Sequence, residues 1–152
     1  MFGWGGHVLR IDLSKRKFVV QSLNSSLAQN YIGGRGFAIK TLWDELPPGA
    51  DPLSPLNKLI LAVGPLTALP IPNSGKLLVA AKSPLTGGYG DGNIGSWLAI
   101  HMRRAGLDMI IIEGKAEEPR TCTSRIRAMN LELILIVRRI YGVLTPSPQR
   151  IG

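Results

Sequence analysis

The sequence predicts an α+β domain, rich in β-sheet, over residues 1–118 of the 152. An alternation of apolar and polar residues near the N-terminus is typical of a half-buried strand. Three short, continuous apolar runs follow, which is typical of fully buried strands. Between these runs, apolar residues recur at helical spacing. Strands and helices are therefore mixed along one domain, and no internal repeat is present.

The first predicted elements form a β-hairpin. Residues 7–13 alternate between apolar and polar side chains. A polar turn, Ser14-Lys15-Arg16-Lys17, follows, and a second strand begins over residues 18–21. Two alternating strands joined by a short polar turn favour antiparallel pairing.

Two helices are predicted next. Asn24-Ser25-Ser26 supplies side chains that cap helix N-termini, so we expect a helix over residues 26–32. Gly33-Gly34-Arg35-Gly36 ends it. Residues 37–46 then carry apolar side chains at helical spacing, and Pro47-Pro48 stops this second helix.

The rest of the domain is predicted as buried strands, a glycine-rich loop and one helix. Three prolines make residues 65–75 irregular, and residues 83–95 are expected to be a loop. Ser96 can cap a helix over 96–105, which Gly106 closes. The three predicted buried strands are residues 59–63, 77–81 and 108–113.

The charge is distributed unevenly. The chain carries a net charge of +8, but residues 1–118 hold 12 Lys and Arg against 9 Asp and Glu, a net of +3. Residues 119–152 hold six Arg, no Lys and one acid, Glu132. This arginine-only tail is atypical of the domain before it, so we expect a frameshifted or truncated reading frame after residue 118.

Composition excludes several classes of protein. Cys122 is the single cysteine, which excludes an internal disulfide and a cysteine-rich metal site. No run of 18 apolar residues predicts a membrane span, and no secretory leader is recognisable, so we expect a cytoplasmic protein without membrane contact. Because most of the excess charge lies in the tail, we expect no nucleic-acid binding by the domain. Binding through the arginine tail is a third hypothesis, which deletion of 119–152 would test.

The stretch from Gly75 to Gly95 is the candidate site. Lys76 opens a short apolar strand, and glycines and a predicted helix start follow. Glycines let the backbone approach a ligand, and a helix N-terminus favours an anion. Gly90 to Gly95 matches G-x-G-x-x-G, but eight residues separate it from the strand, against a dinucleotide fingerprint. An anion cradle and a purely architectural loop both remain open.

At these residues the chain resembles the N-terminal part of the tungsten-dependent aldehyde ferredoxin oxidoreductases, and most of all the formaldehyde-oxidising branch. The resemblance is collinear across residues 1–118, and its segments are specific together. They include Phe2-Gly3-Trp4-Gly5-Gly6, Ile32-Gly33-Gly34-Arg35-Gly36, Asp51-Pro52-Leu53-Ser54-Pro55, Ala62-Val63-Gly64-Pro65-Leu66, Gly75-Lys76 and Gly87-Gly88-Tyr89-Gly90-Asp91-Gly92-Asn93.

The resemblance implies aldehyde oxidation to a carboxylate, with electrons passing through a 4Fe-4S cluster to ferredoxin. It implies a tungstopterin cofactor, in which two molybdopterins hold the metal and a magnesium ion bridges their phosphates. By position, Lys76 would contact the pterins, and the backbone carbonyl of Asn93 would help to hold magnesium. Ile94 and Gly95 would face the phosphates through their N–H groups. These roles agree with the preferences of magnesium for oxygen and of phosphate for lysine.

The departures from the family predict an incomplete enzyme. No residue here matches the family's cluster cysteines or catalytic groups, so no catalytic residue is assigned, and we expect a fragment that is inactive alone. The alternative is a non-catalytic pterin- or anion-binding accessory module that pairs with the missing C-terminal domains as a separate chain. Surfaces that those domains would cover favour self-association.

Overall fold

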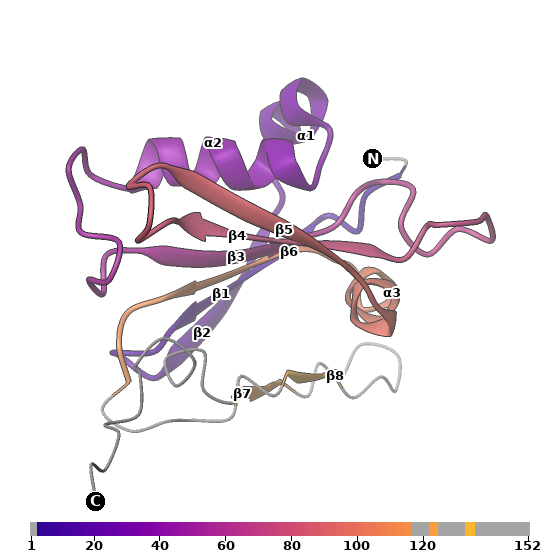
Figure 1. Cartoon of the computed structure of the whole chain (residues 1–152). Coiled ribbons are helices and arrows are strands. Elements are labelled where there is room, and N and C mark those ends of the chain that lie inside the picture. The colour runs from indigo at the N-terminus through magenta and orange to yellow at the C-terminus, as the bar shows by residue number, and fades with distance from the viewer. Residues whose placement is uncertain (1–2, 117–121, 125–132, 136–152) are drawn as a thin grey trace, which may run out of the picture.

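The computed structural model describes residues 3–116, 122–124 and 133–135. Within this part of the chain, a six-stranded sheet lies between helices on its two faces (Figure 1). The elements in chain order are β1 (His7–Asp12), β2 (Lys17–Ser22), α1 (Ser25–Tyr31), α2 (Arg35–Glu45), β3 (Lys58–Ala62), β4 (Lys76–Lys82), β5 (Tyr89–Gly95), α3 (Trp97–Arg104), β6 (Leu107–Glu113), β7 (Cys122–Ser124) and β8 (Leu133–Leu135).

The sheet has the order β2-β1-β6-β3-β4-β5. β1 and β6 are parallel, and the other neighbours are antiparallel. β6 is central because its run Met109-Ile110-Ile111-Ile112 is buried throughout, as a strand covered on both faces requires. β2 and β5 form the two edges and are largely exposed. The predicted α+β, sheet-rich fold is confirmed.

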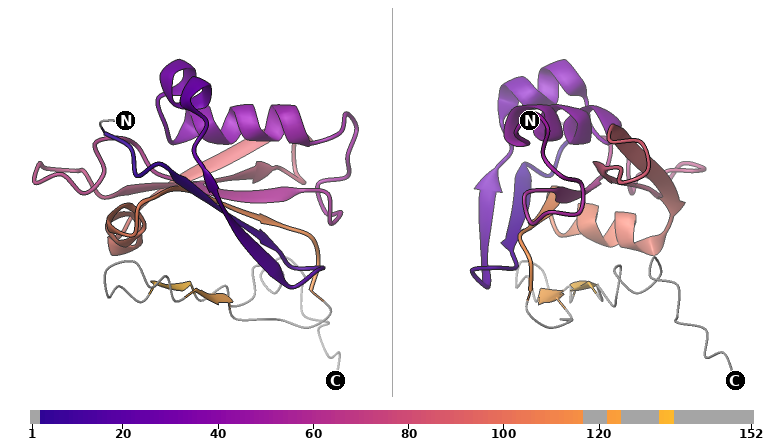
Figure 2. Two further views of the ribbon diagram at one scale, coloured as in Figure 1. Left: turned by 180° about the vertical axis from the view of Figure 1, so that it is seen from behind. Right: turned by 60° about the vertical axis from the view of Figure 1, so that its left-hand side comes forward.

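Each face of the sheet has its own apolar core. Alternate residues of the strands, such as Ile60 and Ile111, pack against Phe37 and Leu42 of α2. Their neighbours in sequence point the other way, toward Met102 of α3. Figure 2 shows the helices on opposite sides of the sheet, with α1 and α2 together on one side and α3 on the other. α1 and α2 therefore cover the same face of the sheet, and the candidate site lies on that face.

The glycine-rich segment is a strand, which corrects the predicted loop over 83–95. Only residues up to Gly88 turn, with Ser83 N–H donating to Gly88 O at 2.8 Å. Residues 89–95 then pair in register with β4 as β5. Glycine has a low strand propensity, so the strand follows from the partner β4 and not from local preference. The G-x-G-x-x-G segment lies inside this strand and does not form the strand-to-helix turn of a dinucleotide fingerprint.

Two polar clusters fasten the helices and the N-terminus to the sheet. Arg10 pairs with both oxygens of Glu45 at 2.7 and 2.8 Å, and Lys58 and Glu113 complete this cluster, which ties the end of α2 to β1, β3 and β6. Asp108 is buried and accepts hydrogen bonds from the backbone N–H groups of Gly5 and Gly6 at 2.9 and 2.6 Å.

The C-terminal part contributes one short sheet. β7 and β8 pair antiparallel, from Cys122↔Leu135 to Ser124↔Leu133. Most of the predicted tail, 119–152, lies outside the described residues. In the described ranges, no helix is long and apolar enough to cross a bilayer.

Candidate anion-binding site

The β4–β5 hairpin brings Lys76 and Asn93 to the same face of the sheet. Lys76 is opposite Gly95, and Leu78 is opposite Asn93. Side chains alternate along a strand, so Lys76, Leu78 and Asn93 share one face. Leu78 packs in the core beneath α1 and α2, which identifies that face. The hairpin thus joins two candidate residues that lie seventeen positions apart in sequence.

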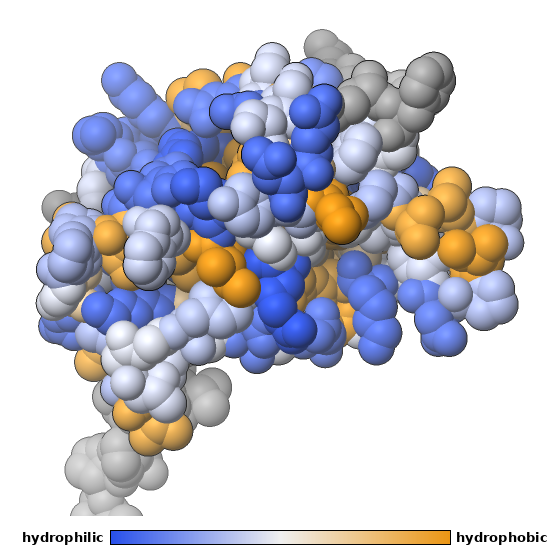
Figure 3. Space-filling view, turned by 90° about the horizontal axis from the view of Figure 1, so that it is seen from above, coloured by the Kyte–Doolittle hydropathy of each residue, from blue (hydrophilic) through white to orange (hydrophobic). Residues whose placement is uncertain are grey.

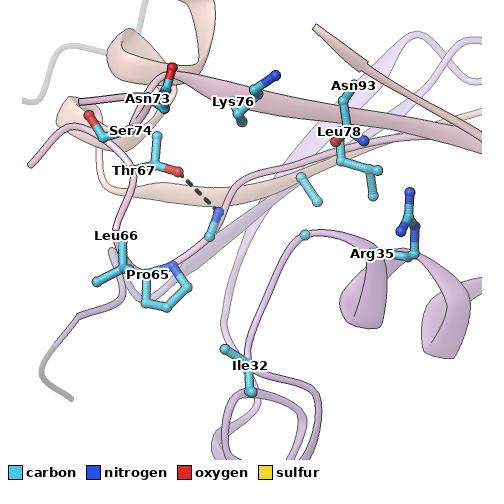
Figure 4. A pocket seen from close by; sticks show the side chains of 13 residues that line it. Ile32, Arg35, Pro65, Leu66, Thr67, Asn73, Ser74, Lys76, Leu78 and Asn93 are labelled. Atoms are coloured by element: carbon cyan, nitrogen blue, oxygen red, sulfur yellow. Dashed lines mark hydrogen bonds between the residues drawn. The ribbon is translucent and has the colours of Figure 1, made fainter. Parts of the chain in front are cut away.

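A pocket of about 400 Å³ lies on this face. Its walls come from the N-terminus of α2, the end of β3, the loop after β3 and the β4–β5 hairpin (Figure 4). The lining is amphipathic. Its apolar side chains are Ile32, Ala62, Pro65, Leu66 and Leu78, and its polar ones are Arg35, Thr67, Asn73, Ser74, Lys76 and Asn93. Such a pocket can accept a molecule with an apolar body and polar or charged groups.

Close backbone packing holds the α1–α2 junction against the end of β3. The N–H of Gly34 donates to Val63 O at 3.1 Å. A Cβ at Gly33 would lie 3.0 Å from Val63 O and 3.1 Å from Gly64 Cα, and φ of Gly33 is +158°. In the loop beyond, Thr67 is buried and its hydroxyl oxygen accepts from Gly64 N–H at 3.1 Å. The glycine pair lets α2 begin at the pocket, where the sequence predicted only a break between helices.

The charged side chains that line the pocket are two cations, Arg35 and Lys76. Lys76 is exposed, and its ammonium has no hydrogen bond or ion pair to any described residue. α2 begins here without a side-chain cap on Gly34 and without an acidic residue in its first turn. Free N–H groups at a helix start carry partial positive charge. The pocket therefore favours an anion.

Arg35 is anchored by an acid on the edge strand. Its Nε donates to Asp91 Oδ2, and its Nη2 donates to Asp91 Oδ1 at 3.2 Å. The hydrogen bond from Arg35 holds the pKa of Asp91 below its ordinary value. Tyr89 donates to Asp91 Oδ2 at 3.1 Å, and burial together with this carboxylate raises the pKa of Tyr89 to about 12. At neutral pH, Asp91 is charged and Tyr89 is protonated.

The hydrogen-bonding order of the hairpin decides which backbone groups of β5 are free. Ser83 N–H bonds to Gly88 O, and Ser96 N–H bonds to Gly75 O at 3.0 Å. In an antiparallel ladder, hydrogen-bonded and non-hydrogen-bonded pairs alternate. When this alternation is followed between the two hydrogen-bonded pairs, the N–H and C=O groups of Ile94 point to β4. The N–H and C=O groups of Asn93 and Gly95 point to the outer edge of the sheet.

The four residues predicted from the sequence thus differ in position. Lys76 and Asn93 line the pocket together. Gly95 lies beside Lys76, with its backbone groups at the open edge. Ile94 is opposite Leu77, so its side chain lies on the α3 face and its N–H is directed to β4. The predicted roles of all four residues stay predictions.

Sequence reasoning missed Arg35 as a site residue. At Gly33-Gly34-Arg35-Gly36 the sequence predicts only a helix break, and the partner of Arg35, Asp91, lies 56 positions away. One feature of the sequence could have identified Arg35 as a site residue. It is a charged residue between glycines, directly before a helical pattern. In the described part of the chain, no group of three or more His, Cys, Asp or Glu could hold a metal ion. Metal binding here would require backbone or amide oxygen.

The structure is an α+β domain with an amphipathic pocket, and the charged side chains that line this pocket are cationic. Comparison with known proteins gives the family. Residues 8–132 match the family model described as aldehyde ferredoxin oxidoreductase, N-terminal domain, and the chain belongs to this family.

Tungsten-containing aldehyde ferredoxin oxidoreductases from two Pyrococcus species are among its relatives. The protein from Pyrococcus horikoshii is 44% identical over 150 residues, which cover 99% of this chain and 24% of the relative. The protein from Pyrococcus furiosus is 44% identical over 119 residues, which cover 78% of this chain and 20% of the relative. The chain therefore spans about a quarter or less of their length. The predicted placement in the formaldehyde-oxidising branch stays a prediction.

A solved structure supports the fold. The active-site complex BamBC of benzoyl coenzyme A reductase, in complex with 1,5-dienoyl-CoA, matches with a TM-score of 0.75 and 34% sequence identity. The match covers 78% of this chain and 18% of that chain. The family match and the alignment to the P. horikoshii protein both extend past residue 118. The proposed boundary there, and the frameshift after it, stay predictions.

Proposed function

We propose that this chain forms one side of a tungstopterin site in an enzyme that oxidises aldehydes and passes the electrons to ferredoxin. The observation that carries the proposal is the amphipathic pocket with Lys76 and Asn93 on one face, in a domain of the aldehyde ferredoxin oxidoreductase family. A pterin with a phosphate group has the apolar ring and the anionic end that such a lining suits.

The residues present fit the cofactor. The ammonium of Lys76, which has no partner among the described residues, is suited to a phosphate as a point charge. The carbonyl of Asn93 at the open edge offers the oxygen ligand that magnesium prefers, and the N–H of Gly95 offers a donor to phosphate. When bound, a tungstopterin would supply the redox chemistry that converts an aldehyde into a carboxylate. The role of this chain is to bind and orient it.

Turnover would require segments that the relatives carry beyond the matched region. The chain spans 24% of the P. horikoshii protein. With one cysteine, Cys122, it cannot supply the ligands of a 4Fe-4S cluster by itself. We therefore propose that the electron path to ferredoxin and the catalytic acid–base groups lie in those further segments, whether they are covalently linked or on a separate chain.

Cofactor retention tests this function. The chain is produced in a host that makes molybdopterin, with tungstate supplied, and the purified protein is assayed for tungsten by mass spectrometry and for pterin by fluorescence. We expect pterin to be retained by the wild type and reduced roughly tenfold in Lys76→Met, since a charged hydrogen bond is worth about 1.5–3 kcal/mol. Lys17→Met on the edge strand β2 is the control and should retain pterin. Equal retention by Lys76→Met and the wild type would contradict the proposal.

An accessory module is the second candidate, and the exposed apolar side chains of the sheet edge and α2 favour it. Phe18 is 72% exposed and Trp43 is 82% exposed. Such side chains are suited to contact with further polypeptide. This candidate predicts pterin retention without aldehyde-dependent dye reduction until the remaining family segments are added as a second chain. Dye reduction by the chain alone would contradict it.

A further inference from the structure

β2 forms one edge of the six-stranded sheet, and its outer side has no strand beside it. The strand order begins β2-β1-β6, so no described strand lies beyond β2. The right view of Figure 2 shows β2 as the outermost strand. Every residue of β2 is exposed, including Phe18 at 72%, Val19 at 53% and Val20 at 48%. An edge with unpaired backbone groups and apolar side chains is suited to pairing with a further strand.

The hydrogen bonds to β1 identify the backbone groups of β2 that point outward. Leu23 N–H donates to Gly6 O at 2.8 Å, so these two residues are a hydrogen-bonded pair at the end of the β1–β2 register. Hydrogen-bonded and non-hydrogen-bonded pairs alternate along an antiparallel ladder. The N–H and C=O groups of Phe18, Val20 and Ser22 therefore point away from β1.

The hydrogen bond from β1 to its other neighbour agrees with this assignment. Leu13 N–H donates to Glu113 O at 2.9 Å, on the side of β6. The backbone groups of odd-numbered residues of β1 therefore face β6, and those of even-numbered residues face β2. Each odd-numbered residue of β1 is opposite an even-numbered residue of β2, from His7↔Ser22 to Ile11↔Phe18. Both observations direct the same residues of β2 to the outside.

We propose that β2 pairs antiparallel with β2 of a second copy of this chain, about a two-fold axis at Val20. In this register Val20 is opposite Val20 of the second copy, and Phe18 is opposite its Ser22. This register pairs the outward groups of all three residues, because positions 18 and 22 are symmetric about position 20. Such a two-fold contact joins two six-stranded sheets into one continuous sheet.

The distribution of charge favours a second copy in the antiparallel direction. β2 begins at Lys17, directly after Lys15-Arg16, and ends at Ser22 without an acidic residue. Antiparallel pairing places the basic ends of the two copies at opposite ends of the contact. Parallel pairing would place them side by side, and like charges across two strands are destabilising.

The apolar side chains favour the same contact. Phe18 and Val20 are opposite Ile11 and Leu9, which belong to the core on the α3 face. They therefore extend that core to the edge of the sheet, where they are exposed. In the proposed pair, the extensions of the two copies meet and cover each other. β5 and the pocket lie at the opposite edge and stay accessible.

Charge pairing at position 20 tests the two-fold register. The full 152-residue chain is studied at low salt by sedimentation velocity as Val20→Lys, as Val20→Glu and as an equal mixture of the two. Each variant alone should dimerise about fivefold more weakly than the wild type, since like charges meet at the axis. The mixture should recover this loss, because opposite charges then meet. Val19→Lys and Val19→Glu, which are off the axis and on the other face, are the control and should recover less on mixing.

Proline at position 20 tests the backbone contact. Val20→Pro removes an N–H that points outward, so the hydrogen bonds to β1 remain, and thermal melts check the fold. We expect dimerisation at least about tenfold weaker, since both copies lose a donor at the axis. Val20→Thr keeps the N–H and should dimerise like the wild type. In the wild type, the amides of Phe18, Val20 and Ser22 should exchange more slowly as the dimer forms, whereas those of Val19 and Gln21 are slow throughout.

Three outcomes would overturn the inference. A wild-type chain that stays monomeric at millimolar concentration has no such contact. Absence of recovery in the mixture of Val20→Lys and Val20→Glu would exclude the axis at Val20. Unchanged dimerisation in a folded Val20→Pro would exclude backbone pairing through β2. Each of these leaves the proposed function in place, because the pocket lies beside β4 and β5 and not beside β2.

Discussion

Asp108 shows how a single side chain can organise the N-terminal segment. Its carboxylate is 1% exposed and accepts from Gly5 N–H, Gly6 N–H and Arg103 Nη1, the last at 2.5 Å. Arg103 also donates to Gly3 O. Trp4 between these glycines donates from Nε1 to Ile32 O at 2.7 Å, so the segment reaches the wall of the pocket.

Replacing Asp108 should therefore be costly. In Asp108→Ala, the mostly buried guanidinium of Arg103 and two backbone N–H groups lose their acceptor. Removal of one partner of a buried ion pair costs about 3–5 kcal/mol, and we expect a loss of unfolding free energy near the lower end. Urea denaturation measures it. Asp44→Asn, whose side chain is 49% exposed and pairs with Lys40, is the control and should cost less than about 0.5 kcal/mol. A loss below 1 kcal/mol for Asp108→Ala would contradict this role.

The residues of the site were only partly predictable. Lys76 and Asn93 could be chosen because the family resemblance and simple phosphate chemistry point to the same positions. Arg35 could not be chosen from the sequence, because the position of its side chain depends on a hydrogen bond to Asp91. Asp91 lies beside Arg35 only when β5 pairs with β4. The alternation that turns the backbone of Ile94 away from the open edge is also a property of pairing, which no local pattern in the sequence reveals.

At the scale of elements, the α1–α2 junction depends on the absence of a side chain at Gly36. A Cβ there would lie 2.3 Å from Tyr31 O, a backbone atom of the preceding helix. Gly36→Ala should lower the unfolding free energy by about 1–3 kcal/mol through overpacking, which outweighs the helix preference of alanine. Gly92→Ala is the control, since nothing lies within 4 Å of its added Cβ. Equal urea midpoints for the two variants would show that the junction adjusts freely.

The end of α2 is held to the sheet by a cluster with a pH dependence of known sign. Burial opposes the charge of Glu45, but the hydrogen bond and charge of Arg10, with Lys58, hold its pKa below the ordinary value. A lowered folded-state pKa gives stability that is present above the unfolded value of about 4.3 and is lost as the pH falls through the folded value.

Glu45→Gln tests this dependence. We expect a loss of about 1 kcal/mol at pH 7, because the cluster is partly exposed, and a shallower fall in stability between about pH 4.5 and 3 than in the wild type. Urea midpoints against pH measure both. Asp44→Asn, one position earlier on the same helix, is the control for the loss of one negative charge at pH 7. A parallel shift of the whole Glu45→Gln curve would show that the cluster contributes packing and no titrating charge.

Elements were predicted well where the pattern was local. The first hairpin, both early helices and the three buried strands match their predicted places within one to a few residues. β5 was missed because glycines at 90, 92 and 95 remove the apolar alternation that marks a strand. Its strand state comes from hydrogen bonds to β4, which are made between segments and not within one.

At the scale of the whole molecule, β2 and β5 have no further strand beside them among the described residues. Figure 3 shows the face that carries α1 and α2, where apolar side chains (orange) stand at the surface among hydrophilic ones (blue). On β2, every residue is exposed, and Phe18 and Val20 lie on the face opposite to that of α1 and α2. Unprotected edge strands with apolar side chains favour association between chains.

We therefore expect concentration-dependent self-association through β2, measured by sedimentation velocity. Phe18→Lys should shift the distribution toward the monomer, because it places a charge within the apolar strip. Gln21→Lys adds the same charge to the same strand on its opposite face and is the matched control. An unchanged distribution in Phe18→Lys would exclude β2 as the contact. The strand order that makes β2 and β5 the edges was not predictable, because it is set by pairing between distant segments.

The alternating ladder of β5 has a consequence for the exchange of amide hydrogens with solvent. The N–H groups of Gly92 and Ile94 are directed to β4, whereas those of Asp91, Asn93 and Gly95 are directed to the open edge. Neighbouring amides of one strand should thus exchange at rates that alternate from slow to fast. A ligand bound at this edge would slow the amide exchange of Asn93 and Gly95 and leave that of Ile94 unchanged. Exchange rates along β5 would therefore report, residue by residue, whether the edge is occupied.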